Sequence, residues 1–181
     1  VVGQRYGAPR SLHSCPARRA SEMYVGTYHR YNCGSMAGKG LDLTEFDGGQ
    51  HFLAACSALH ADEEDPELMF QDWEGIPSGL ASESHVNWAF IDAYRQAKAE
   101  GQGEAFIEWA EYFNACDYDA FQEAYLGEAE TEEDYACDFA DETGLLDDMP
   151  DSLLIYFDYE AYGRDMFLNG LVLLNGYVFS E

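Results

Sequence analysis

The sequence predicts an α+β fold, arranged as two or three small units in succession along an elongated chain. Three observations predict it: strand-like segments near the N-terminus, helical periodicity through the middle, and a hairpin signal near the C-terminus. The strand-like segments are residues 24–31, 41–43 and 68–73, and the hairpin signal is Asn175-Gly176. Acidic residues recur in every unit, so we expect carboxylates on the outside of each.

The first unit combines three strands with one helix. A glycine-rich turn at residues 33–40 joins the first two strands, and Gly48-Gly49 precedes a helix with apolar residues at helical spacing. A charged loop and Pro66 then lead into the third strand. A sheet of this size with one helix is only marginally stable by itself.

Several helices follow the first unit. Ser82 is the expected N-cap of a helix over residues 83–98, and the next helix, over residues 104–115, has an aromatic face and an acidic face. We expect a short helix over residues 118–125 and an acidic one over residues 131–142. A last helical segment beyond Pro150 leads to the hairpin, whose strands are residues 171–174 and 177–179.

The acidic residues form a long stretch without counter-ions. No Lys, Arg or His lies between Lys98 and Arg164, whereas acids recur every three or four positions. Glu130, Asp134 and Asp138 are four residues apart, so a helix would place their carboxylates about 6 Å apart in a row. Like charges at this spacing cost a helix a few tenths of a kcal/mol each. Their repetition indicates that the charge serves a function.

Composition limits the classes of function. A hydrophobic content of 47% and an aromatic content of 15% indicate a folded chain despite the net charge of -26. The acidic pI of about 4.1 argues against direct nucleic-acid binding and against attraction to an anionic membrane, and favours a basic partner or cations. No apolar run approaches the ~18 residues of a membrane span. Five scattered cysteines favour free thiols in a reducing compartment, and hence a cytoplasmic protein.

Residues 1–22 differ in character from the rest of the chain. Four arginines stand against the single acid Glu22, without the apolar core of a secretory signal. We interpret this segment as a disordered extension outside the fold. The alternative is a basic arm that folds back on the acidic body.

The chain lacks the usual signatures of catalysis and metal binding. Residues 34–40 resemble a phosphate loop that is one residue short and has no Ser or Thr for magnesium. Asp117, Asp119 and Glu128 fit three positions of a calcium loop, but Phe121 and Gln122 occupy positions that need a ligand and a glycine. The cysteines and histidines show no zinc spacing, and no nucleophile elbow is present. We therefore predict no enzyme, no metal and no cofactor.

Mimicry of DNA is one interpretation of the charge. From Met23 onward, 34 acids and 5 bases give a net charge of about -29. Duplex DNA carries one charge per ~1.7 Å of axis, so this charge corresponds to roughly 50 Å of duplex, and twice that in a dimer. The alternative is a solvated acidic surface that aids solubility. Composition leaves both interpretations open.

An ordered series of segments resembles the ArdA antirestriction proteins, small acidic DNA mimics carried by mobile genetic elements. The resemblance runs from Met23 to the C-terminus and leaves only residues 1–22 outside. It rests on residues 23–28 with Tyr31, Asn32 and Gly34, on residues 41–43, 70–77 and 125–128, and on residues 156–165.

This resemblance implies two small α+β domains flanking a helical one. We place their boundaries at residues 23–80, 81–125 and 126–181, with residues 1–22 as the extension. It also implies a homodimer formed through the C-terminal part, and occupation of the DNA-binding cleft of type I restriction-modification enzymes, chiefly in their methyltransferase and specificity subunits. The acidic antirestriction motif of the family corresponds to residues 145–150 and those just after.

Two sets of residues carry this hypothesis. The candidate dimer residues are Leu153, Leu154, Ile155, Tyr156, Phe157 and Tyr159, each of which could equally belong to the core. The carboxylates that we predict to contact the partner are Glu100, Glu104, Glu108, Glu111, Asp117, Asp119, Glu123, Glu128, Glu130, Glu133, Asp134, Asp138, Asp141, Glu142, Asp147, Asp148 and Asp151. A general acidic binding module for basic, nucleic-acid-binding or histone-like proteins is the alternative function.

Overall fold

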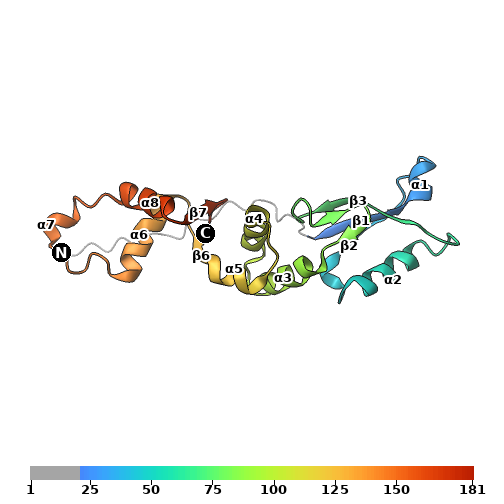
Figure 1. Cartoon of the computed structure of the whole chain (residues 1–181), viewed down its shortest axis with the longest axis horizontal. Helices are drawn as coiled ribbons and strands as arrows, with labels where there is room; N and C mark the ends of the chain where they lie inside the picture. Colours follow the sequence, from blue (N-terminus) through green and yellow to red (C-terminus); the bar gives the residue numbers. More distant parts are fainter. Residues whose placement is uncertain (1–20) are drawn as a thin grey trace, which may run out of the picture.

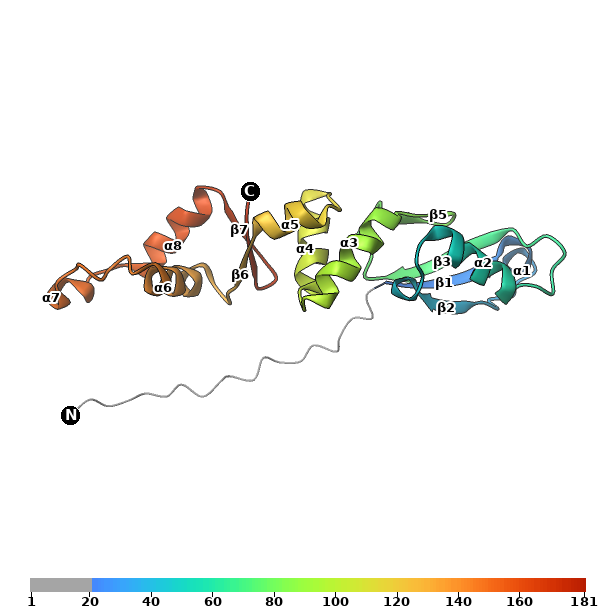
Figure 2. The same cartoon turned by 90° about the horizontal axis from the view of Figure 1, so that it is seen from below.

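The computed structural model describes residues 21–181 and confirms the predicted α+β class (Figure 1). Helices and three small antiparallel sheets follow one another along a single long axis, as two perpendicular views show (Figures 1 and 2). The predicted N-terminal extension lies outside the described residues except for Ser21 and Glu22. Ser21 is buried, and Glu22 begins the first strand.

The N-terminal sheet has the strand order β2-β1-β3 and is antiparallel throughout. Its strands are β1 (Glu22–Thr27), β2 (Lys39–Asp42) and β3 (Leu68–Glu74), and a short 3-10 turn, η1 (Leu43–Glu45), follows β2. Alternation along β1 directs Met23 and Val25 into the core, because successive side chains of a strand point to opposite faces. Helix α2 (Gly49–Leu59) packs there through Phe52, whose ring lies 5.5 Å from that of Phe70.

The first predicted strand is too long, because residues 28–31 are helical. Strand β1 ends at Thr27, and the short helix α1 (Tyr28–Asn32) begins directly after it. Thr27 caps this helix, since its hydroxyl oxygen accepts a hydrogen bond from the backbone N–H of Arg30. A favourable cap therefore prevails over the β propensity of the tyrosines.

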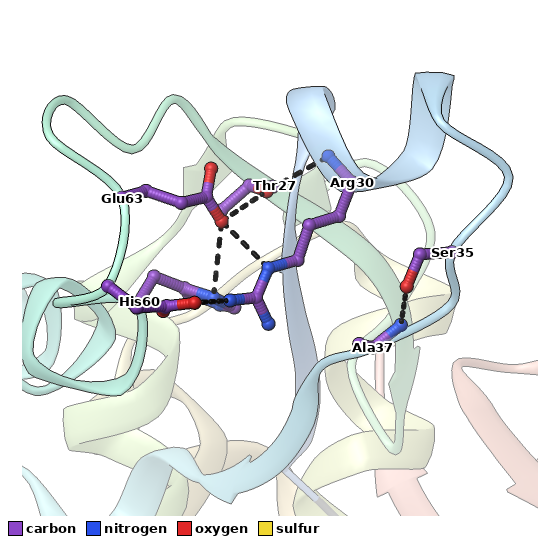
Figure 3. Close-up of polar contacts among 7 residues, drawn as sticks. Thr27, Arg30, Ser35, Ala37, His60 and Glu63 are labelled. Carbon is purple, nitrogen blue, oxygen red and sulfur yellow. Dashed lines mark hydrogen bonds and ion pairs between the residues drawn. The ribbon is translucent and has the colours of Figure 1, made fainter.

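Glu63 closes the long loop between α2 and β3 onto the end of β1 (Figure 3). Its Oε1 atom accepts a hydrogen bond from the Thr27 hydroxyl at 3.0 Å and lies 2.8 Å from Nε of Arg30. His60 is fully buried beside this group, with Nδ1 3.9 Å from the same oxygen. The cluster holds a charged loop against the sheet and explains why Arg30 is not free to pair elsewhere.

The expected helix start at Ser82 is also wrong. Residues 81–86 form a small hairpin of β4 (Ala81–Ser82) and β5 (His85–Val86), and helix α3 (Trp88–Ala99) begins after it. Asn87 caps α3 by accepting hydrogen bonds from the N–H groups of Ala89 and Phe90. The apolar spacing of residues 83–98 is real, but its first turn is replaced by the hairpin.

Three helices form the middle of the molecule, as predicted. Helix α3 packs against α4 (Gly103–Phe113), and α5 (Tyr118–Ala124) completes the group. Buried aromatic rings fill their centre, with Phe106 lying 5.6 Å from Phe90 and 5.3 Å from Phe121. This cluster is continuous with the core under the N-terminal sheet.

The C-terminal sheet contains one strand that the sequence did not predict. Its order is β6-β8-β7, and the hairpin of β7 (Leu171–Leu174) and β8 (Tyr177–Ser180) confirms the prediction from Asn175-Gly176. Both turn residues have positive φ, 48° and 95°, as a type I′ turn requires. Strand β6 (Tyr125–Glu128) follows α5 directly and takes its place beside β8.

Helices α6 (Glu132–Thr143) and α8 (Tyr159–Leu168) pack together beyond this sheet. The contact uses small residues, namely Ala136 and Ala140 of α6 and Gly163 of α8. The short helix α7 (Asp151–Leu154) lies at the far end of the molecule (Figure 1). Between residues 21 and 181, no helix has the length and apolar character needed to cross a membrane.

Candidate functional site: an acidic surface

The predicted contact carboxylates are distributed over the middle and C-terminal parts of the molecule. They lie at the end of α3, along α4 and α5, on β6, along α6 and in the segment that leads to α7. All of them are exposed except Glu108, which is half-buried. Glu132, at the start of α6, is equally exposed and belongs with this group, although sequence reasoning did not select it.

None of these carboxylates forms an ion pair with another residue that the structure describes. Among residues 21–181, the ion pairs involve Arg30, His60 or Arg95, and none reaches an acid beyond Asp92. Arg164, on α8, is the sole Lys or Arg after Lys98. Arg164 lines a hollow with Glu132 and Glu133 of α6. The other contact carboxylates of α4 to α7 have no ion-pair partner among residues 21–181, so their charge is available to solvent ions or to a partner.

Helix α6 shows which of its acids support the fold. Thr131 caps the helix by accepting from the N–H of Asp134, and its hydroxyl donates to the Asp134 carboxylate at 2.7 Å. Acids in the first turn are also favoured by the helix dipole. Asp141 and Glu142 lie in the last turn, where the dipole disfavours acids and where no base is present. These two carboxylates oppose helix stability, which points to a role outside the fold.

The electrostatic effect of α6 on its own side chains is visible in their pKa values. Burial raises the pKa of the Cys137 thiol, and the carboxylates of Asp141 and Asp138 raise it further. Burial likewise raises the pKa of Tyr135, with a contribution from Glu142. Both shifts have the sign expected of groups that ionise to anions in a negative potential.

The acids of α4 contact the C-terminal hairpin. Glu108 accepts a hydrogen bond from the Asn175 amide at 2.7 Å, and Glu104 accepts one from the Tyr177 hydroxyl at 3.4 Å. Burial and the charge of Glu104 raise the pKa of Tyr177 to about 12. Sequence reasoning missed these partners, because they lie far along the chain from α4.

Asp117 also has a structural role. It is the N-cap of α5, and its carboxylate accepts a hydrogen bond from the N–H of Ala120 at 2.8 Å. An exposed cap of this kind contributes about 1 kcal/mol to stability. Asp117 remains exposed, so the cap and the negative surface coexist at this position.

The candidate dimer residues lie at and just after α7, at one end of the molecule. Ile155 and Tyr156 are 78% and 77% exposed, and Leu153 is exposed as well. Leu154, Phe157 and Tyr159 are half-buried. Large apolar side chains with this exposure are uncommon on a monomer surface when they occur together.

One hollow of the molecule is apolar and lies away from the acidic helices. This hollow of about 430 Å³ lies between α2 and α3 and is lined by Phe52, Phe70 and Trp88, with His85 as its one titratable side chain. General acid–base chemistry needs at least a positioned pair of groups. Within residues 21–181, no three His, Cys, Asp or Glu side chains gather as metal ligands would.

Comparison with known protein families assigns most of the chain. The family model described as antirestriction protein (ArdA) matches residues 23–179. This range includes every predicted contact carboxylate and every candidate dimer residue. No curated protein matches the sequence.

Proposed function

The chain belongs to the ArdA antirestriction family, and from this premise we propose that it inhibits type I restriction-modification enzymes by mimicking duplex DNA. Its acidic surface occupies the DNA-binding cleft formed by the methyltransferase and specificity subunits. It acts there as an inhibitor without catalysing a reaction, and so protects incoming mobile DNA in the cytoplasm of a bacterial cell.

One observation carries this proposal: exposed carboxylates extend from α4 to α7, and none of the ion pairs among residues 21–181 reaches them. A protein cleft that binds DNA is lined with Lys and Arg that neutralise phosphates. A carboxylate has a pKa near 4, so this surface stays ionised at neutral pH as phosphates do. The Lys and Arg side chains of the cleft can therefore be neutralised either by the phosphates of DNA or by these carboxylates.

The rows of acids match DNA better in average charge density than in the spacing between successive charges. Asp134 and Asp138 are four residues apart on α6, which gives a spacing of about 6 Å along the helix axis. Phosphates along one DNA strand are about 3.4 Å apart. Basic side chains are long and flexible, so agreement in average density is sufficient for attraction. Solvent screening makes each exposed pair of a carboxylate and a basic side chain contribute little, so the affinity arises from the sum of many such pairs.

We propose that the mimic is a homodimer joined through the segment around α7. Two chains this acidic repel each other, so their interface must be apolar, and Leu153, Ile155 and Tyr156 supply such a surface. Pairing at one end of an elongated molecule would double the length of the acidic surface. Asp147 and Asp148, in the position of the antirestriction motif, would then lie near the middle of the dimer.

We also keep the division into segments 23–80, 81–125 and 126–181 as a proposal for the domains. The N-terminal sheet falls almost wholly within the first segment and the hairpin of β7 and β8 within the last. In this division the middle and last segments bear the contact carboxylates.

The test is direct competition for the enzyme. Purified type I methyltransferase core is bound to a labelled duplex with its target sequence, and the protein is added at about 0.15 M salt. We expect displacement of the DNA at nearly stoichiometric protein, with potency falling as salt rises. A folded protein that displaces no DNA would contradict the proposal.

Selectivity separates mimicry from general binding of basic proteins. The same titration is run with an unrelated basic protein, such as a histone, in place of the methyltransferase core. A shaped mimic leaves that complex largely intact at the same salt. Equal displacement from both would favour the general acidic module.

A further inference from the structure

Three side-chain hydrogen bonds join one face of α4 to the C-terminal hairpin. The Tyr177 hydroxyl donates to Glu104 at 3.4 Å, the Asn175 amide donates to Glu108 at 2.7 Å, and the Tyr112 hydroxyl donates to Glu181 at 3.2 Å. We call this set the α4–hairpin seam.

The seam follows the helical repeat of α4. Positions 104, 108 and 112 are each four residues apart, so they lie on the same face of the helix. The eight helical steps from Glu104 to Tyr112 span about 12 Å, and the four extended steps from Tyr177 to Glu181 span about 13 Å. Strand β8 can therefore lie lengthwise along α4 with a contact near each end, while Asn175 of the preceding turn donates to Glu108.

Aromatic packing holds the same face of the hairpin, because residues 177, 179 and 181 alternate to one side of β8. Phe179 is fully buried, and its ring lies 6.3 Å from that of Phe121 on α5 and 5.7 Å from that of Tyr125. The hydrophobic contact attaches the hairpin to the middle helices but is not directional. The hydrogen bonds of the seam fix the orientation of the hairpin on α4, because each bond places a donor opposite an acceptor.

We infer that Tyr112, Asn175 and Tyr177 are positioning residues that fix the orientation of the C-terminal acidic helix relative to α4 and α5. This inference rests on the proposed function, in which the carboxylates of both parts enter one binding cleft. Their relative position then matters as much as their number. None of the three positioning side chains carries a charge at neutral pH, so composition gives no sign of their role.

The physical reason is the entropy of binding. If the two acidic parts turned freely about β6, the partner would have to order them on contact, which weakens affinity. A fixed seam removes that requirement before binding occurs. Loss of the seam should leave the association rate almost unchanged, because that rate follows the charge, and should accelerate dissociation.

A variant that keeps the charge isolates this effect. Tyr112→Phe, Asn175→Gly and Tyr177→Phe together remove all three donors, and glycine preserves the positive φ that the turn needs. The control makes the same chemical changes at residues that form none of the seam's hydrogen bonds: Tyr31→Phe, Asn114→Gly and Tyr118→Phe. Asn114 also has positive φ, at 51°, so the two glycine substitutions are matched.

Two measurements on the full chain test the inference. Backbone amide exchange and small-angle X-ray scattering report whether the hairpin loosens and the distance distribution broadens. Binding kinetics on the immobilised methyltransferase core report association and dissociation. We expect faster exchange at residues 174–181, a broader distance distribution, and dissociation faster on the order of tenfold, with association and the control triple like the parent protein.

Each outcome decides the inference. Unchanged exchange and scattering in the seam variant would overturn it, whatever the binding result. A loosened seam with unchanged dissociation would also overturn it, since fixed orientation would then not matter for binding. If the parent protein itself fails to displace DNA, the proposed function fails, and the scattering and exchange results still show whether the seam fixes the two parts.

Discussion

Gly163 of α8 lies so close to α6 that a Cβ atom there would stand 2.5 Å from the carbonyl oxygen of Glu132. It would also lie 3.3 Å from the Cβ of Ala136. Backbone atoms cannot move aside as a flexible side chain can, so the contact requires the absence of a side chain. The crossing of α6 and α8 therefore depends on one glycine in the most acidic part of the molecule.

Gly163→Ala should destabilise the pair of helices although alanine is the better helix former. Relief of the clash requires the helices to separate, and overpacking of this kind costs about 1–3 kcal/mol. Urea denaturation of the full chain measures the change. Asp165→Ala, at an exposed position of the same helix, should stay within about 0.5 kcal/mol of the parent protein. A Gly163→Ala protein as stable as this control would contradict the prediction.

Glu63→Ala should destabilise the N-terminal sheet. The substitution leaves the buried Thr27 hydroxyl and Nε of Arg30 without their shared acceptor, and such a loss costs about 1–3 kcal/mol. Denaturation at neutral pH measures it. Glu64→Ala removes the same charge one residue further on, at an exposed position, and should have little effect. Similar losses in both variants would show that net charge, and not the cluster, controls stability.

Alkaline pH should weaken the hairpin through Tyr177. Its pKa is raised to about 12 in the folded state, mainly by burial and by Glu104, whereas an unfolded tyrosine has a pKa of about 10. The resulting stabilisation is complete below about pH 10 and is lost as the pH rises toward 12. Unfolding free energies measured across this range should fall less steeply in Tyr177→Phe than in the parent protein. Parallel curves would refute the assignment.

The Cys137 thiol should react slowly with a neutral alkylating reagent near pH 8. Its raised pKa lowers the fraction of thiolate, the reactive form. Asp138→Asn with Asp141→Asn should lower the pKa and increase the rate, although burial, the larger cause, remains. Mass spectrometry of the Cys137 peptide gives the rate, with the Cys33 peptide of the same sample as reference. An unchanged rate would indicate that burial alone sets the pKa.

Single neutralisations of the acidic surface should have small effects on DNA displacement. Changing Glu104, Glu111, Glu130, Asp134 or Asp138 to its amide should each weaken inhibition by less than about fivefold, because exposed pairs contribute little. The same expectation holds for Glu108, although the bonds of Glu104 to Tyr177 and of Glu108 to Asn175 add a structural part. Complete loss at one of these positions would argue against a distributed mimic.

Neutralising a block of acids should weaken inhibition far more. A quadruple variant of α6, at Glu133, Asp138, Asp141 and Glu142, should raise the half-maximal concentration roughly tenfold to a hundredfold. The matched control neutralises four exposed acids near the N-terminal sheet, namely Glu45, Glu64, Asp65 and Glu67. Both variants have the same net charge. Equal losses would show that total charge matters and its position does not.

The features predicted correctly from sequence are those fixed by near neighbours. Asn175 and Gly176 set the hairpin turn by their own backbone preferences, and Thr131 begins α6 by bonding to a residue three positions away. The long run without Lys or Arg likewise left the acids no partner in that part of the chain. These are local or compositional properties, so no knowledge of the fold was needed.

The secondary-structure predictions were wrong where the conformational preference of a segment competed with another interaction. The tyrosines after Thr27 favour a strand, yet the cap at Thr27 and the bond from Glu63, which is distant in sequence, end the strand there. Strand β6 was not predicted, because its partner, β8, lies about fifty residues away. A strand is stable only beside another strand, and the sequence of one strand does not identify the strand that pairs with it.

The sequence by itself determined the sign, amount and approximate extent of the charge, because the acids between Lys98 and Arg164 outnumber all the Lys and Arg residues of the chain and cannot all be paired by them. Only the tertiary structure decided which carboxylates also hold the molecule together. Glu104 and Glu108 accept hydrogen bonds from residues about seventy positions away, and Gly163 permits two acidic helices to touch. Such contacts join atoms that meet only after folding, and periodicity within one segment cannot encode them.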